Sequence, residues 1–216
     1  MRQLISSISR RLFRPAETLD GYDDPELVEV IFRKTLAYDP QGVWPEMIGV
    51  SSILDFGGGC GQHYKLARRQ SPEIRWAVVE TPAMIERAEQ FATDRLRFFP
   101  DVADAANWLG IVDVMHSNSA LQYAPDPLEK LNQLCAVRAK TMLWKRLSLS
   151  KSSIEREIQS SLLGDNGPGS LPGLREKTVR YTRTKIPEQV FLDAHIDYML
   201  TERGPDWFNF SLKQSA

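Results

Sequence analysis

Strand-like and helix-like segments alternate along the first two thirds of this 216-residue chain. Strands are predicted where short apolar runs occur, over 51–56, 74–80, 96–100, 111–118 and 139–146. Helices are predicted between and before them, over 25–38, 62–70, 82–94, 102–109 and 127–138. Asp24-Pro25 and Thr81-Pro82 are typical helix starts, an N-cap followed by proline at the first helical position. The alternation predicts an α/β fold whose parallel sheet is covered by helices on both faces.

The pattern breaks over residues 148–186, which are rich in glycine and proline and have no clean period. The segment 152–163 within them is compatible with one helix, and the rest is a long excursion from the sheet, a candidate substrate-binding segment. A helix over 186–196 and two strands in a hairpin, 197–203 and 206–213, are predicted to end the chain. The length predicts one domain, 1–216.

Charge and cysteine content bear on the partner and the compartment of the protein. The formal net charge is −1, so nucleic acid is not an expected partner. Two cysteines are too few for a disulfide framework, which favours a reducing cytoplasm. Residues 1–20 form a basic, amphipathic N-terminal arm with apolar residues at helical spacing. This arm is compatible with packing on its own domain, with a peripheral membrane contact and with an organelle presequence, and the sequence does not choose.

The glycine-rich stretch "ILDFGGGCG" follows the first strand of the alternation. Such a turn before a helix is a nucleotide site by general physics, because glycine allows close approach to the backbone and the helix N-terminus is electropositive. Neither the phosphate-cradling P-loop pattern nor the dinucleotide fingerprint fits the spacing. What fits is an acid followed by alternating glycines, Asp55, Gly57, Gly59 and Gly61. An acid in that place suits a cationic ligand such as S-adenosylmethionine (SAM).

Three stretches resemble the class I, Rossmann-like SAM-dependent methyltransferases, in particular their small-molecule branch. "ILDFGGGCG" is similar to the first motif of that family, and "WAVVE", ending at Glu80, is similar to the second. "VDVMHSNSALQYAPDP" resembles the region of the fourth strand. The likeness covers residues 50–147 well and 187–213 by pattern. It implies an enzyme with SAM as cofactor, S-adenosylhomocysteine (SAH) as product, and a seven-stranded, mostly parallel sheet ending in an antiparallel hairpin.

The resemblance also implies a role for individual residues in holding the cofactor. Asp55 would orient the amino group of SAM, Glu80 would bind the ribose, and Asp101 would contact the adenine. The remaining residues that it places at the cofactor are Gly57, Gly58, Gly59, Ser117 and Asn118. The simpler alternatives are a ligandless turn for the glycines, a solvated acid for Glu80 and a helix cap for Asp101.

Catalytic and acceptor-binding residues are less constrained by the pattern. His116, near the end of the fourth strand, is the first candidate for a general base, although strand alternation could equally pack it against the sheet. Tyr123 is a second catalytic candidate, and His63 and Tyr64, directly after the glycines, are alternatives to His116. The candidates for acceptor contact near these motifs are His63, Tyr64 and Gln122. No metal is expected, because the cysteines and histidines lie on different predicted elements.

The acceptor class follows from what the fourth-strand region lacks. Members of the family that methylate DNA bases or protein amides generally carry Asn/Asp-Pro-Pro-aromatic there, where this chain has "HSNS". This favours a hydroxyl, carboxyl or amine of a small molecule or glycan. Arg180, Tyr181 and Arg183 suggest an anionic acceptor, with a solvated basic face as the simpler alternative. A non-catalytic SAM-binding protein, a nucleotide-sugar or dinucleotide enzyme and an RNA or protein methyltransferase remain as other hypotheses, and the oligomeric state stays open.

Overall fold

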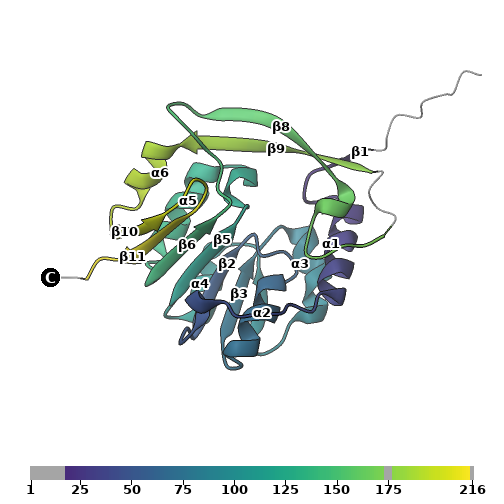
Figure 1. Ribbon diagram of the computed structural model, residues 1–216, viewed down its shortest axis with the longest axis horizontal. Coiled ribbons are helices and arrows are strands. Elements are labelled where there is room, and N and C mark those ends of the chain that lie inside the picture. The colour runs from purple at the N-terminus through teal and green to yellow at the C-terminus, as the bar shows by residue number, and fades with distance from the viewer. Residues whose placement is uncertain (1–17, 173–176, 215–216) are drawn as a thin grey trace, which may run out of the picture.

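The computed structural model describes residues 18–172 and 177–214, which form two β-sheets with helices around the larger one (Figure 1). The larger sheet has seven strands, as the resemblance implies. In chain order they are β2 (Ser52–Phe56), β3 (Arg75–Val79), β4 (Leu96–Phe99), β5 (Val114–Asn118), β6 (Thr141–Lys145), β10 (Tyr198–Arg203) and β11 (Phe208–Leu212). The five strands predicted from the apolar runs and the closing hairpin are therefore confirmed.

The order of the strands creates a switch point beside β2. Across the sheet the order is β10-β11-β6-β5-β2-β3-β4, and the strands from β2 to β6 run parallel. The chain runs outward from β2 through β3 to β4 and then returns to place β5 on the other side of β2. β11 is antiparallel to β6 and lies between β6 and β10. Ligands of open α/β sheets bind where the strand order reverses, which here is just beyond the carboxyl ends of β2 and β5.

Six α-helices among the described residues cover the two faces of this sheet. They are α1 (Pro25–Ala37), α2 (Gln62–Gln70), α3 (Pro82–Ala88), α4 (Val102–Leu109), α5 (Pro127–Ala136) and α6 (Glu188–Ala194). One apolar core joins α1, α2 and α3 to one face, and a second joins α4, α5 and α6 to the other. Successive side chains of a strand point to opposite faces of the sheet, so Ile53 belongs to the first core and Leu54 to the second.

Helix boundaries follow the sequence signals closely, with one shortened element. Asp24, Thr81 and Asp126 cap α1, α3 and α5, each with its side chain accepting a backbone N–H and each followed by proline. The helix predicted over 82–94 ends earlier, and η2 (Glu89–Phe91) follows as a 3-10 turn. Two other short 3-10 helices, η1 (Pro45–Met47) and η3 (Leu121–Tyr123), lie in the loops before β2 and after β5.

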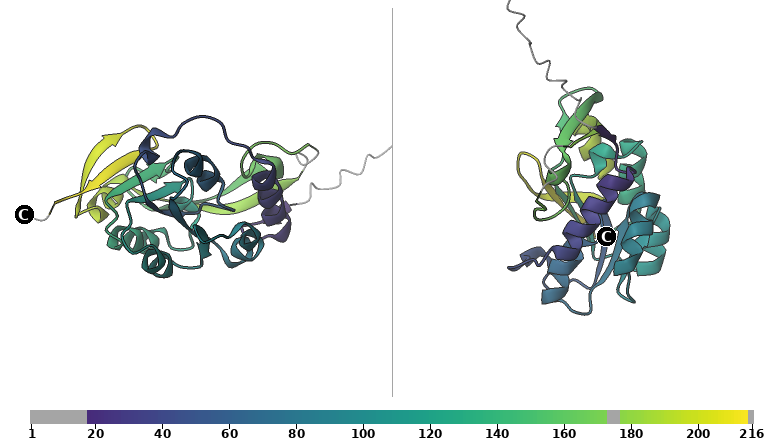
Figure 2. Two further views of the ribbon diagram at one scale, coloured as in Figure 1. Left: turned by 90° about the horizontal axis from the view of Figure 1, so that it is seen from below. Right: turned by 90° about the vertical axis from the view of Figure 1, so that its right-hand side faces the viewer.

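The excursion over 148–186 forms most of the second sheet. Its strands are β1 (Thr18–Asp20), β7 (Leu149–Ser150), β8 (Glu155–Leu162) and β9 (Thr178–Pro187), and η4 (Leu163–Asp165) follows β8. The prediction of a helix over 152–163 is wrong, because this segment pairs antiparallel with β9 from Glu155 to Leu162. Figures 1 and 2 show β8 and β9 as long strands that cross above one end of the main sheet, between α6 and α1.

The N-terminal arm lies outside the described residues for positions 1–17, while 18–20 are β1, which pairs with β9. Within the described ranges no helix combines the length and apolar character needed to cross a bilayer. Cys60 and Cys135 are free thiols. The division into a single domain stays a prediction.

Candidate functional site

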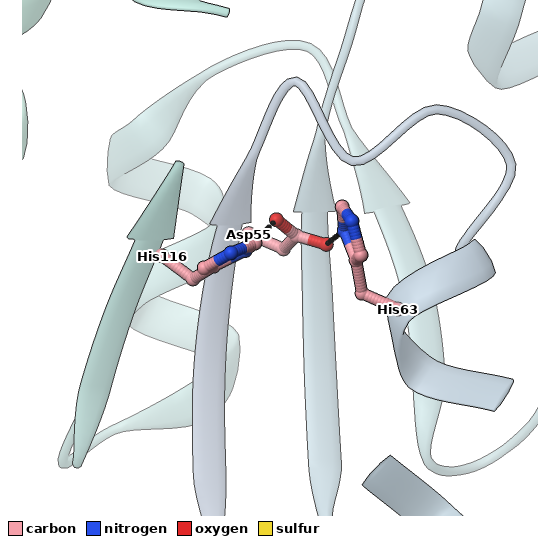
Figure 3. A group of neighbouring side chains, drawn as sticks. All are labelled: Asp55, His63 and His116. Carbon is pink, nitrogen blue, oxygen red and sulfur yellow. Dashed lines mark hydrogen bonds and ion pairs between the residues drawn. The ribbon is translucent and has the colours of Figure 1, made fainter. Parts of the chain in front are cut away.

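Asp55 lies at the carboxyl end of β2, fully buried beneath the glycine turn (Figure 3). Its Oδ1 is 2.8 Å from His116 Nδ1, and its Oδ2 is 3.2 Å from His63 Nδ1. The indole N–H of Trp76 also donates to Oδ2, at 3.1 Å. Burial opposes ionisation, but the two imidazoles and their hydrogen bonds lower the pKa of Asp55 further than burial raises it. Asp55 is therefore a carboxylate committed to protein donors, and it does not line the cavity described below.

His116 lies beside Asp55 because the sheet registers them opposite each other on β5 and β2. Alternation turns its side chain to the α1–α3 face, where 1% of it is exposed, and Trp44 packs edge-on against it. Burial lowers the pKa of His116, so the ring is neutral at pH 7. His116 does not line the cavity, so the geometry does not favour its role as general base, which stays a prediction.

His63, in the first turn of α2, is the member of this group that reaches the cavity. Its Nδ1 faces Asp55, and its Nε2 lies 3.4 Å from Asn118 Nδ2. Asn118 Oδ1 in turn accepts a hydrogen bond of 2.7 Å from Arg146 Nε. A chain of polar contacts thus runs from the buried carboxylate of Asp55 to the guanidinium of Arg146 at the cavity wall.

The expectation that the histidines are scattered is also corrected. Ligand-type atoms of Asp55, His63 and His116 lie within 4.8 Å of one another, close enough to consider a metal ion. Both Asp55–His distances, 2.8 and 3.2 Å, are those of ordinary hydrogen bonds. Protons on the two rings account for the arrangement, so we interpret it as a hydrogen-bond network.

The glycine turn is shaped by close contacts that a side chain would prevent. Gly57 has φ +71°, and a Cβ there would lie 2.1 Å from the Cβ of Ala120 in the loop after β5. A Cβ on Gly58 would lie 2.4 Å from Asp55 Oδ2. Gly57 and Gly59 line the cavity, whereas Gly58 faces Asp55. The turn therefore both packs on the loop after β5 and covers the buried acid.

Glu80 follows β3 and supports the same turn from the neighbouring strand. Its Oε1 accepts the N–H of Gly59 at 2.9 Å, and its Oε2 accepts the N–H of Thr81 at 3.0 Å. Burial raises the pKa of Glu80, and these two hydrogen bonds oppose the shift. Glu80 lines the cavity, and each carboxylate oxygen retains capacity for another donor.

One cavity of about 830 Å³ connects these features. Its floor includes Gly57, which follows β2, Glu80, which follows β3, and Asn118, the last residue of β5. Its other side is formed by the second sheet, through Gln159 on β8 and Tyr181 on β9. The cavity thus lies between the two sheets at the switch point.

Three tyrosines from separate elements meet at this cavity. The ring centroids of Tyr22, Tyr123 and Tyr181 lie 5.0 to 5.5 Å apart. Tyr123 donates its hydroxyl proton to Gln159 Oε1 at 3.0 Å, and Tyr181 donates to Ser161 Oγ at 2.9 Å. Burial raises the pKa of the Tyr22 hydroxyl above its ordinary value. The cluster attaches the second sheet to the loop after β5.

Like Asp55, Gly58 and His116, four further predicted site residues do not line the cavity: Asp101, Ser117, Tyr64 and Gln122. Asp101 caps α4, accepting the N–H of Asp104 at 2.9 Å, and its predicted adenine contact stays a prediction. Ser117 is buried on the face of β5 opposite to His116. Tyr64 packs in the core against Trp76, because one residue along a helix turns it away from His63.

Gln122 is the fourth of these residues; its side chain is held by hydrogen bonds within the protein, and its predicted acceptor contact stays a prediction. Its side-chain amide donates to Ser119 Oγ and to the carbonyl of Arg146, both at 3.1 Å. Ser119 and Arg146 have left-handed backbones, with φ +58° and +49°. Gln122 thus joins two residues in a costly conformation, both of which line the cavity.

The basic residues of β9 are separated from the cavity. Arg180 is exposed, and Arg183 pairs with Glu157 directly across the β8–β9 hairpin. Neither lines the cavity, whereas Tyr181 does. Alternation along β9 explains why Arg180 and Tyr181 differ. The structure therefore does not bring Arg180 and Arg183 to the cavity, where they were predicted to bind an anionic acceptor.

Tyr22, Gln62, Arg146 and Gln159 line the cavity but were not singled out from the sequence. Gln62 had a usable signal, because it opens the helix directly after the glycines. Gln159 had none, because it belongs to the segment predicted as a helix. Arg146 follows the fifth predicted strand, at the carboxyl edge where ligands bind, and that position was a signal not used.

Comparison by sequence matched no family model and no curated protein. Comparison by structure matched the sugar N-methyltransferase KedS8 from a Streptoalloteichus species, 16% identical, with 88% of this chain and 87% of that chain covered and a TM-score of 0.51. DesVI from Streptomyces venezuelae is 13% identical, with 87% and 89% covered and a TM-score of 0.50. The glycopeptide N-methyltransferase MtfA, solved with SAM, is 9% identical, with 82% and 90% covered and a TM-score of 0.48. The strand order and the first two matches show that this chain has the Rossmann-like fold of the class I methyltransferases.

Proposed function

We propose that this protein is a SAM-dependent methyltransferase that acts on a hydroxyl, carboxyl or amine group of a small molecule or glycan. The observation that carries the proposal is the pairing of Glu80 with the glycine turn at the wall of one cavity, where Glu80 Oε1 accepts the N–H of Gly59. KedS8, which shares the fold, is a sugar N-methyltransferase. That likeness supports the class of acceptor proposed for this chain.

The residues at the cavity suit SAM in three respects. Glu80 offers free lone pairs to two ribose hydroxyls, as a carboxylate at this strand end can. Gln62 Oε1 is buried without a hydrogen-bond partner among the described residues, an acceptor available to the amino group of a ligand after a small rotation. The volume, about 830 Å³, is near the upper end of small-molecule sites and leaves room for an acceptor beside the cofactor.

When bound, SAM supplies an electrophilic methyl group on a sulfonium. The contribution of the chain is to align a nucleophile with that methyl and to exclude water. Asn118 and Ser119, at the end of β5, are proposed to lie beside the methionine part, and Asp55 is proposed to support the turn from below rather than to touch SAM. Gln159 and Tyr181 of the second sheet are proposed to enclose the acceptor.

The proposal is tested by binding of SAH to the full chain, measured by calorimetry and thermal shift. SAH at a hundred times its Kd should stabilise the protein by about 2.7 kcal/mol, and NAD should not. Glu80→Gln should weaken SAH about tenfold to a hundredfold, because one ribose acceptor becomes a donor and a charge-assisted hydrogen bond is lost. Glu73→Gln, an exposed acid paired with Arg95, is the matched control and should bind as the wild type does.

Transfer is tested separately from binding. Tritiated SAM is incubated with the protein and the low-mass fraction of a source-cell extract, and labelled product is counted. Binding of SAH together with transfer supports the enzyme. Binding without transfer to any fraction supports the non-catalytic SAM-binding alternative, and stabilisation by NAD in place of SAH contradicts both.

A further inference from the structure

The orientation of one amide determines where the proton on His63 lies. Arg146 Nε–H donates to Asn118 Oδ1 at 2.7 Å, and a guanidinium cannot accept a hydrogen bond. The oxygen of Asn118 must therefore face Arg146, which turns its Nδ2 toward His63 Nε2 at 3.4 Å. Because Nδ2 is a donor, Nε2 is the acceptor, and the proton of the neutral ring is on Nδ1.

Asp55 fixes the other side of the same ring. His63 Nδ1–H points to Asp55 Oδ2 at 3.2 Å, while His116 and Trp76 hold the carboxylate in place. A buried carboxylate behind an imidazole stabilises the imidazolium that forms when Nε2 takes a proton. His63 thus has an unprotonated nitrogen, Nε2, at the cavity and a counter-charge behind it, and an acceptor O–H or N–H would take the place of the long 3.4 Å contact from Asn118 Nδ2.

We propose that His63 is the general base of the methyl transfer and that Asp55 is the residue that positions it. This inference rests on the proposed function. In the step, a lone pair of the acceptor oxygen or nitrogen bonds the methyl carbon, the C–S bonding pair returns to sulfur, and the acceptor proton passes to His63 Nε2. The acceptor is therefore a hydroxyl or a neutral amine that carries an N–H, since a carboxylate has no proton to lose.

Neighbouring candidates are less suited to this role. His116 is buried and does not line the cavity, and Tyr123 donates its hydroxyl proton to Gln159. The backbone around the chain of contacts is also costly, since Arg146 and the neighbour of Asn118, Ser119, have positive φ. Such strain is concentrated at functional sites, and here it belongs to the residues that orient the amide.

The tautomer can be read without knowing the acceptor. The full chain, labelled with 15N-histidine and saturated with SAH, is examined at pH 7 by two-bond proton–nitrogen NMR, with His63→Gln to assign the signals. The expected result is a protonated Nδ1 and a bare Nε2 on His63. A proton on Nε2, with or without one on Nδ1, would overturn the inference.

A second variant moves the same proton in a defined direction. Asn118→Asp replaces the donor that faces Nε2 with an acceptor, so a proton should appear on Nε2 of His63. An unchanged His63 spectrum in this variant would contradict the contact on which the inference rests. The variant also tests the inference where direct loss of Asp55 unfolds the protein.

Activity gives the third readout. His63→Gln should bind SAH but lower tritium transfer about 10²–10⁴-fold, the range of a lost general base. His195→Gln is the control, because it removes a buried histidine that lies away from the cavity, and it should transfer at the wild-type rate. Full transfer by His63→Gln would overturn only the role of His63 as general base. Failure of the wild type to bind SAH would overturn the proposed function.

Discussion

Position 58 shows how a single residue can be constrained by a neighbour that the sequence places three positions away. The carboxylate of Asp55 turns upward beneath the glycine loop, and a Cβ on Gly58 would meet its Oδ2 at 2.4 Å and its Cγ at 2.7 Å. The acid cannot move aside cheaply, because His63, His116 and Trp76 all hold it. Glycine is therefore required here by the network below the turn.

Gly58→Ala should lower the free energy of unfolding by about 1–3 kcal/mol, the usual cost of overpacking a tight site. It should also weaken SAH, because relief of the clash displaces either the turn or Asp55. Urea unfolding and calorimetry measure the two effects. Gly110→Ala is the control. Its backbone has φ +76° but open space around the new Cβ, so it should lose stability and keep its SAH affinity.

The site could be predicted in part at the residue scale, because Glu80 and the glycines belong to local motifs. The contact of Asp55 with His116 could not, because it depends on which strands become neighbours, and β2 and β5 are 61 residues apart at that pair. His63 and Tyr64 are adjacent in sequence, yet only the phase of α2 decides that one reaches the cavity and the other the core. Phase and register are set by packing.

At the element scale, β8 shows why the second sheet was not predicted. Ile154, Ile158 and Leu162 recur every four residues, a spacing that fits one face of a helix and also one face of a strand. The pairing with β9 decides between them, and β9 lies on the other side of a long loop. All three side chains remain substantially exposed, so they do not mark a buried face of either a helix or a strand.

The attachment of α6 to β6 has a consequence for pH. His195, which caps the end of α6, is buried, accepts the indole N–H of Trp144 at 3.0 Å and contacts the carbonyl of Phe191 through Nδ1 at 2.7 Å. Burial lowers its pKa to about 4 in the folded protein, against about 6.5 when unfolded. The unfolded state therefore binds more protons between these values, so this contribution to stability is complete above pH 6.5 and is lost as pH falls toward 4.

His195→Gln should remove this contribution to the pH dependence, since the glutamine oxygen can still accept from Trp144 and does not titrate. Between pH 7 and 5 the wild type should lose about 2 kcal/mol more stability than the variant. Urea unfolding of both proteins at pH 7, 6 and 5 gives the difference, in which other titrating groups cancel. Parallel losses in the two proteins would show that His195 is not the source.

At the scale of the whole molecule, the cavity exists only while the second sheet stays over the switch point. Lys34 of α1 secures that arrangement. Its side chain is buried, and its Nζ donates to the carbonyls of Gly164 at 2.8 Å and Asn166 at 2.6 Å. Residues 165–168 of the same loop line the cavity, and Gly167 packs against the backbone of Ile31. One lysine thus connects the helical layer to the cover of the site.

Lys34→Met should lower stability by about 1–3 kcal/mol, because two buried carbonyls lose their donor. It should also speed amide exchange over residues 163–168 and weaken SAH by loosening the cavity wall. Lys65→Met is the matched control. Lys65 also donates to two carbonyls, Thr35 at 2.8 Å and Leu36 at 3.4 Å, but these lie on α1. The control should change stability without changing exchange at 163–168. If both variants loosen that loop equally, Lys34 does not hold the second sheet over the site, and the cavity depends on the tyrosine cluster instead.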